Sequence, residues 1–141
     1  MAKLTQEIKD VFAKSRPFIM ATADKDGKPN GVPIGLAKII SDDEIMLVDL
    51  FMHKSVLNIK ENPWVSITFW NTEVRYGYQV KGKAILETSG KYFDEAEAWL
   101  EGRQTPFDAK PKTVVVVKVE EIYYIGAGKD SSIRLDQQDA G

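Results

Sequence analysis

The sequence predicts a mainly β (α+β) domain: a six-stranded antiparallel β-barrel with two or three flanking helices. About six apolar or alternating segments are joined mostly by short turns, such as those at residues 24–28 and 41–43, which suits hairpins rather than crossover connections. A length of 141 residues corresponds to one domain. We place it over residues 1–141, with a polar tail expected to fray from about residue 130.

The first half of the chain predicts one helix and three strands. Apolar side chains recur at helical spacing over residues 5–14, and Thr5 suits the N-cap. Strands are expected over residues 18–22, 30–40 and 44–50. Pro33 lies in the second of these, and proline has no amide hydrogen for a β-ladder. We therefore expect an irregular edge strand, or a place where a flat ligand approaches the backbone.

A short helix is predicted inside the stretch Phe51–Pro63, and Asn62-Pro63 ends it because a residue before proline avoids the helical region. Lys54 and Ser55 stand at its start, where unpaired N–H groups and the helix dipole attract anions. An ammonium and a hydroxyl at this place suit a phosphate group. The alternative, in which Ser55 only caps the helix and Lys54 is solvated, stays open.

The second half predicts strands over residues 65–69, 76–88 and 113–119, and a helix over residues 89–101. Gly82 indicates a bulge or bend within the long middle strand. The last strand is almost entirely valine, which is typical of a strand buried on both faces. Residues 122–125 extend or follow it.

Composition excludes several classes of function. The chain has no cysteine, so thiolate catalysis and Cys-based metal sites are excluded, and its one histidine rules out a His-rich metal site. A net charge of −2 argues against nucleic acid and membrane partners. No apolar run approaches the roughly 20 residues that span a bilayer, and the first residues lack the apolar core of a signal peptide, so we expect a cytoplasmic protein. Any redox chemistry would depend on a borrowed cofactor.

The order of several motifs resembles the pyridoxamine 5′-phosphate oxidase-like superfamily, the FMN-binding split β-barrels. The motifs are Asn30-Gly31-Val32-Pro33-Ile34, then Met52-His53-Lys54-Ser55 with Asn58, then Asn62-Pro63-x-Val65-Ser66-Ile67, and finally Gly77-Tyr78-Gln79-Val80-Lys81-Gly82-Lys83-Ala84. The likeness covers roughly residues 5–120. Among the members of the superfamily, the chain is similar to the small FMN-binding proteins.

This resemblance implies a homodimer with two FMN sites at the subunit interface. It assigns the phosphate to Lys54 and Ser55 with Asn58 nearby, while His53 either contacts phosphate or ring or is a solvated loop residue. The remaining positions implied for the flavin ring and for closure of the site are Pro33, Ile34, Gly35, Val48, Asp49, Leu50, Tyr78, Gln79, Trp70 and Asn71. The resemblance implies neither a metal nor a catalytic side chain.

The expected activity is that of an FMN-dependent oxidoreductase with a small-molecule or protein redox partner. We do not expect a true pyridoxamine 5′-phosphate oxidase, because His53-Lys54 stands where those enzymes have an Arg-Lys pair and their C-terminal substrate-binding segment is not evident. An electron carrier without a substrate of its own, an F420-dependent reductase, a haem protein and a plain β-barrel binding module are the alternatives.

Overall fold

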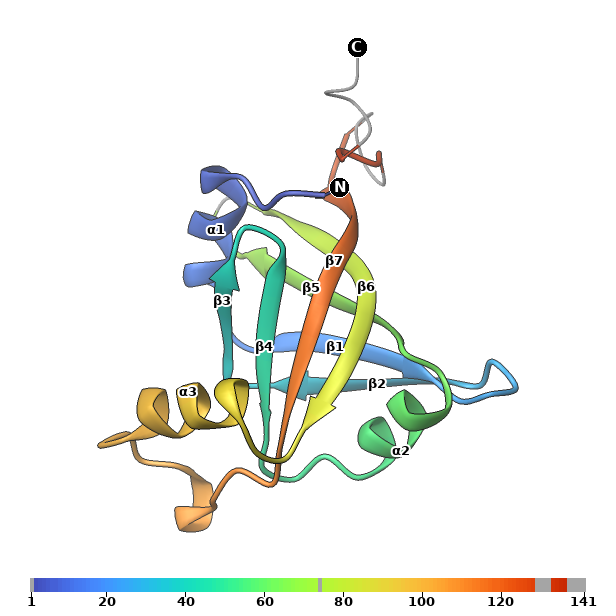
Figure 1. Cartoon of the computed structure of the whole chain (residues 1–141). Coiled ribbons are helices and arrows are strands. Elements are labelled where there is room, and N and C mark those ends of the chain that lie inside the picture. The colour runs from blue at the N-terminus through green and yellow to red at the C-terminus, as the bar shows by residue number, and fades with distance from the viewer. Residues whose placement is uncertain (1, 74, 129–132, 137–141) are drawn as a thin grey trace.

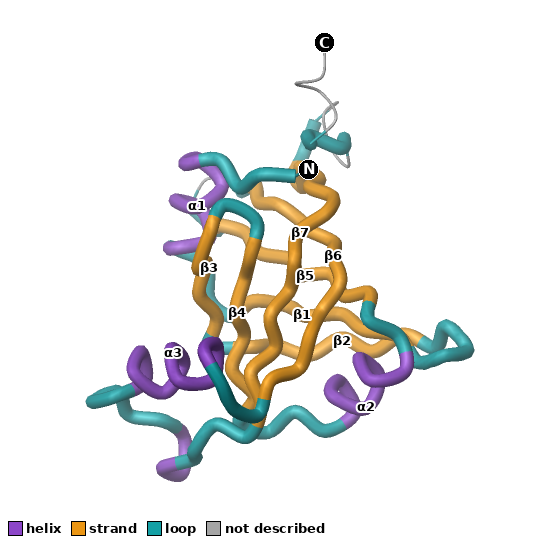
Figure 2. The backbone as a smooth tube through the Cα atoms, in the orientation of Figure 1, coloured by secondary structure: helices purple, strands orange, loops and turns teal. Residues whose placement is uncertain are grey.

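The protein is mainly β, with one seven-stranded antiparallel sheet and three α-helices outside it (Figures 1 and 2). The computed structural model describes residues 2–73, 75–128 and 133–136. In chain order the elements are α1 (Gln6–Ala13), β1 (Phe18–Ala23), β2 (Pro29–Ile34), β3 (Ala37–Ser41), β4 (Glu44–Asp49), α2 (Lys54–Glu61), β5 (Trp64–Asn71), β6 (Tyr76–Glu87), α3 (Lys91–Leu100), the 3₁₀ helix η1 (Pro106–Asp108) and β7 (Thr113–Gly126).

The number of strands differs from the sequence prediction. Residues 30–40 were expected to form one strand, but the chain breaks at Gly35 and Leu36 into β2 and β3. The physical reason is local: Pro33 cannot donate to a ladder and Gly35 weakens a strand. After the break the chain changes partner, since β2 pairs with β1 while β3 pairs with β4. The sheet therefore has seven strands rather than six.

The sheet consists of a three-stranded meander, β5-β6-β7, with one hairpin on each side of it: β1-β2 on one side and β3-β4 on the other. Its order is β2-β1-β5-β6-β7-β4-β3, so β2 and β3, which are consecutive in the chain, lie at opposite ends. Figure 2 shows β1 and β2 running across the direction of β3 and β4, as a strongly coiled sheet does. No ladder joins β2 to β3 in the part of the chain that the structure describes, so the sheet is not closed by hydrogen bonds.

Two apolar clusters occupy the two faces of the sheet. The larger cluster lies inside the curve of the sheet, where Phe12 of α1 stacks on Phe18 at 4.3 Å between ring centroids. The smaller cluster lies under α3 and includes Val114 and Val116. Alternate valines of β7 thus face different clusters, which confirms that the start of this strand is buried on both faces.

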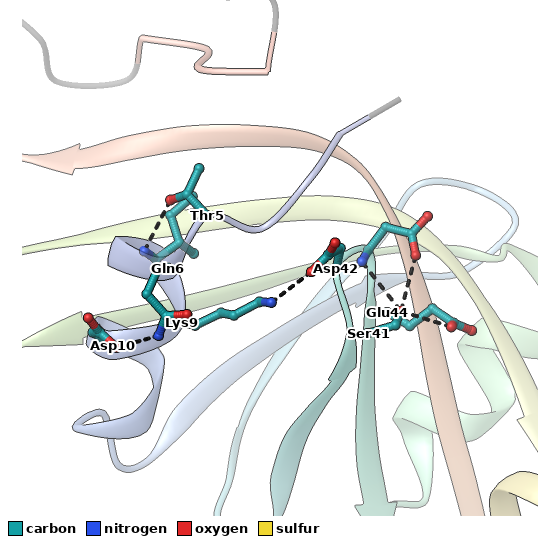
Figure 3. A network of polar contacts seen from close by, with 9 residues as sticks. Thr5, Gln6, Lys9, Asp10, Ser41, Asp42 and Glu44 are labelled. Carbon is teal, nitrogen blue, oxygen red and sulfur yellow. Dashed lines mark hydrogen bonds and ion pairs between the residues drawn. The ribbon is translucent and has the colours of Figure 1, made fainter.

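Local signals position several elements as the sequence predicts. Thr5 caps α1, its hydroxyl accepting a hydrogen bond from the Ile8 amide at 3.3 Å. The β6–β7 register shifts between Lys81 and Gly82, which confirms the bulge. Lys9 of α1 forms a 2.7 Å ion pair with Asp42 in the β3–β4 turn, which ties the helix to that hairpin (Figure 3).

The chain after β7 partly departs from expectation. We expected fraying from about residue 130, yet residues 133–136 pair with β7: the Tyr124 amide donates to the Ile133 carbonyl and the Leu135 amide to that of Ile122. Residues 129–132 and 137–141 lie outside the described residues. Within residues 2–73, 75–128 and 133–136, no helix is long and apolar enough to cross a bilayer.

Candidate functional site

A cavity of about 680 Å³ lies where the β2–β3 connection faces the end of β4 and the start of α2. Figure 1 shows α2 beside β2, with the connection from β4 leading into it. The lining is mostly apolar, with three polar side chains at one end. The lining residues are Val32, Pro33, Ile34, Gly35, Leu36, Val48, Leu50, Phe51, Met52, His53, Lys54 and Ser55. Both the size and the composition are typical of a small-molecule site.

The backbone at Gly35 leaves open space. A Cβ atom built on Gly35 would meet no heavy atom within 4 Å. Pro33 and Gly35 are both exposed and line the cavity, while Ile34 between them is buried in the larger cluster. A flat group can therefore approach this backbone closely.

Asp49 fixes the path of the chain from β4 into the cavity wall. Its side chain is buried and points away from the cavity, because Val48 and Leu50 on either side line the cavity and strand side chains alternate. Its carboxylate accepts a hydrogen bond from the Met52 amide at 2.6 Å. Burial raises the pKa of Asp49, while the Met52 amide and the charge of Lys112 oppose that rise. Asp49 is therefore a support of the loop rather than part of the lining.

The polar end of the cavity is the N-terminus of α2. The helix begins at Lys54 after His53, whose side chain makes no capping hydrogen bond, and no acidic residue lies in the first turn. The first N–H groups of such a helix have no intrahelical acceptor and carry partial positive charge. The side chains of His53 and Lys54 are exposed, whereas Ser55 in the first turn is 1% exposed. This end of the cavity therefore attracts an anion.

Ser55 is held from below by a buried polar network. Its hydroxyl oxygen accepts a 3.1 Å hydrogen bond from the side-chain amide of Asn30. Asn58 donates at 3.0 Å to the hydroxyl of Thr22, which is 4% exposed and also accepts from Asn30 at 3.5 Å. The Ser55 hydroxyl proton thus stays available for an acceptor outside the network. Asn58, implied by the resemblance to lie near a phosphate, directs its amide to Thr22 beneath the helix.

Besides Asp49 and Asn58, four more predicted site residues do not line this cavity. Trp70 and Asn71 end β5, and the Asn71 side chain accepts from the Glu73 amide at 2.9 Å in the following turn. Tyr78 is 4% exposed in the larger cluster, and burial raises its pKa to about 12. Gln79 donates to Thr68 at 3.4 Å. Their assignment to a flavin site stays a prediction.

Sequence reasoning missed several residues that the structure brings together. Phe51 and Met52 line the cavity beside the predicted His53 and Lys54. Asn30 donates to the Ser55 hydroxyl, and Thr22 accepts from Asn30. A signal for Thr22 was present, since it follows Phe18 and Met20 at every second position of β1 and is therefore a polar residue on the core-facing side of a strand.

A family model and a related protein each match most of the chain. Residues 4–126 match the sequence model described as pyridoxamine 5′-phosphate oxidase. The uncharacterized protein MJ0282 of Methanocaldococcus jannaschii is 37% identical over 133 residues, which cover 93% of this chain and 87% of that protein.

Solved structures share the fold. HupZ from Group A Streptococcus superposes with a TM-score of 0.79 at 29% identity, covering 90% of this chain and 98% of HupZ. An FMN-binding protein from Syntrophomonas wolfei subsp. wolfei gives a TM-score of 0.77 at 21% identity, covering 89% of this chain and 88% of the other. At that identity the second likeness concerns the fold alone.

Proposed function

This chain belongs to the pyridoxamine 5′-phosphate oxidase family, and on that premise we propose that it is a cytoplasmic FMN-binding flavoprotein that acts as an oxidoreductase. The proposed FMN site is the cavity between the β2–β3 connection, the end of β4 and α2. The proposal includes a homodimer in which the partner subunit covers the open side of each cavity. The Syntrophomonas wolfei protein of the same fold is FMN-binding, which supports the choice of cofactor.

One observation carries the proposal: an apolar cavity of about 680 Å³ ends at an uncapped helix start that presents Lys54 and Ser55. The phosphate of FMN has close to two negative charges at neutral pH, as a phosphorylated side chain does. In the proposed complex Lys54 and the first N–H groups of α2 would hold this charge. The Ser55 hydroxyl, with its oxygen already bonded to Asn30, would donate its proton to a phosphate oxygen.

The apolar part of the cavity fits the flavin ring. Its walls are Val32, Leu36, Val48 and Leu50, and Phe51 stands at the open side with 59% of its surface exposed. The extended backbone from Pro33 to Gly35 would supply donors and acceptors to the edge of the ring.

Exposed apolar side chains near the cavity support the homodimer. Phe51 meets Phe107 edge to face, with 6.4 Å between ring centroids, and Phe107 is 95% exposed. Leu57 on α2 is 51% exposed. A concentration of large exposed apolar side chains is typical of an interface.

Bound FMN would supply the transfer of a hydride or of single electrons between donor and acceptor. The chain's own part would be to bind and orient the ring and to keep water from it. His53 and Lys54 are the titratable side chains in the described lining of the cavity. Because the flavin itself would exchange the hydride or electrons, proton transfer by a protein side chain is not part of the proposal.

The test begins with the visible absorption spectrum of the purified protein and the mass of whatever is released on denaturation. We expect flavin bands and FMN. Lys54→Ala should weaken FMN binding by about tenfold or more, because a charge-assisted hydrogen bond to the phosphate is lost. Lys60→Ala, in the last turn of the same helix, is the matched control and should leave the affinity unchanged. A colourless protein that takes up no added FMN would refute the proposal.

Enzyme and electron carrier are separated by kinetics. An oxidoreductase should show saturable turnover when a nicotinamide donor and a range of acceptors are supplied to the FMN-loaded protein. A carrier would exchange electrons with a partner protein and show no saturation with any small molecule.

A further inference from the structure

A second cavity, of about 490 Å³, lies between α1, β3 and the C-terminal end of α3, and we call it the β3 groove. We propose that the β3 groove binds a small aromatic anion of nucleotide type, with its ring against the paired Trp99 and Arg103 side chains and its negative charges on the surrounding cations. Its lining is Lys9, Phe12, Ala13, Arg16, Ala37, Lys38, Ile39, Ile40, Ser41, Trp99 and Arg103. The groove is separate from the proposed FMN cavity, with which it shares no lining residue.

Charge is the first argument. The chain as a whole has a net charge of −2, yet four of the eleven described lining residues are cations and none is a carboxylate. They come from three places in the chain: Lys9 in α1 and Arg16 after it, Lys38 in β3, and Arg103 after α3. Asp42 takes up the charge of Lys9 through their 2.7 Å ion pair (Figure 3). The other three form no ion pair with a described carboxylate, so the groove keeps an excess of positive charge.

The two arginines are positioned without carboxylates. Arg103 donates from Nε to the Trp99 carbonyl at 3.1 Å, and its guanidinium lies 4.9 Å from the centroid of that indole. Arg16 donates to the Ser15 carbonyl and lies 4.9 Å from the centroid of the Phe18 ring. These contacts fix each guanidinium with one N–H group and leave the remaining donors for an anion.

Trp99 supplies an aromatic surface in the same groove. It is half-buried against the cluster under α3, and Lys38 lies 5.9 Å from its ring centroid. Ala37, Ile39 and Ile40 add apolar surface from β3, which is an edge strand with β4 as its one neighbour in the sheet. An occupant that uses both kinds of contact carries a flat ring and at least two negative charges. A nucleoside diphosphate has this chemistry and fits a cavity of this size.

The experiment is calorimetric titration of the full chain with ADP, at low and at moderate salt. We expect saturable binding that weakens as salt rises, and at least about tenfold weaker binding in Arg103→Ala and in Lys38→Ala. Lys83→Ala is the matched control, because Lys83 is also exposed and lies 5.5 Å from the centroid of an indole, that of Trp64, outside the groove. ADP affinity should be unchanged in this control.

Two further titrations distinguish failure of this proposal from failure of the FMN proposal. Adenosine, which has the ring without the charges, should bind at least tenfold more weakly than ADP. Lys54→Ala reports on the first cavity: ADP affinity that fell with Lys54→Ala and not with Arg103→Ala would place ADP in the FMN cavity and overturn the inference. Absence of saturable ADP binding, or equal losses in Arg103→Ala and Lys83→Ala, would overturn it as well.

Discussion

Removal of the Thr22 hydroxyl tests the polar network under α2. Thr22→Val keeps the shape of a side chain that is 4% exposed and removes the acceptor of a 3.0 Å hydrogen bond from Asn58. One neutral hydrogen bond contributes about 1 kcal/mol net, and a donor left without an acceptor adds about 1–3 kcal/mol. Because Asn58 is only half-buried and water reaches part of it, we expect a total loss of about 2 kcal/mol in the free energy of unfolding.

The assay is urea unfolding followed by circular dichroism, with thermal unfolding as a second measure, in which we expect a decrease of roughly 6 °C in Tm. Thr68→Val is the matched control: Thr68 lies on β5, is half-buried and accepts a longer 3.4 Å hydrogen bond from Gln79. It should cost less than about 0.5 kcal/mol. Equal losses in the two variants would refute the reasoning.

A double variant checks that the cost arises from the Asn58 amide. In Asn58→Ala the donor is absent, so adding Thr22→Val should cost about 1 kcal/mol less than it does in the unaltered chain. The same network predicts a division of roles in the proposed FMN complex. Asn58→Ala should lower stability more than FMN affinity, and Ser55→Ala should do the reverse, since Ser55 is among the residues that line the cavity and Asn58 is not.

Three other predictions address the sheet, the C-terminal segment and the assembly. Gly82→Ala should destabilise the fold by about 3 kcal/mol or more, because the new Cβ atom would lie 1.9 Å from a backbone carbonyl oxygen of β7, whereas Gly31→Ala meets no atom within 4 Å and should change stability by less than about 1 kcal/mol in urea unfolding. Burial raises the pKa of Asp136, but hydrogen bonds from a neighbouring guanidinium and the Ile122 amide outweigh it and hold the pKa below its usual value of 3.8. The stability that Asp136 contributes is therefore present above that value and lost as pH falls below it. Between about pH 5 and pH 3 the free energy of unfolding should fall more in the unaltered chain than in Asp136→Asn. Equal losses in the two would contradict this. Sedimentation of the FMN-loaded protein at micromolar concentration should show a dimer, and a monomer alone would contradict the proposed assembly.

The fold class and most of the elements follow from the sequence because their signals are local. Alternation in residues 65–69 and valines in residues 113–119 predict strands directly, and Thr5 predicts its helix start. The break at Gly35 was misread, since the sequence shows irregularity at Pro33 and Gly35 but not that the chain changes partner there. The order of the strands could not be predicted, because β1 pairs with β5 and β4 with β7 across long stretches of chain.

The residues of the candidate site likewise fall into those with a local signal in the sequence and those without one. Lys54, Ser55 and the backbone from Pro33 to Gly35 could be identified from charge, helix start and chain irregularity, and they line one cavity. Asn30 could not, since its contact with Ser55 joins residues 25 positions apart. Tyr78 has no local signal that separates a core aromatic from a ligand contact, and in this chain it lies in the core.

The division of the sheet into two hairpins and a meander determines at which stage of folding the cavity forms. One wall comes from the β1–β2 hairpin and another from the β3–β4 hairpin, and each hairpin joins the β5–β6–β7 meander through a single long-range ladder. Such pairings between distant segments form slowly, so the cavity is completed only when both have docked. A molecule bound there holds the two docked hairpins together and stabilises the native state in proportion to the logarithm of its concentration. Binding at this cavity would therefore be coupled to docking of both hairpins.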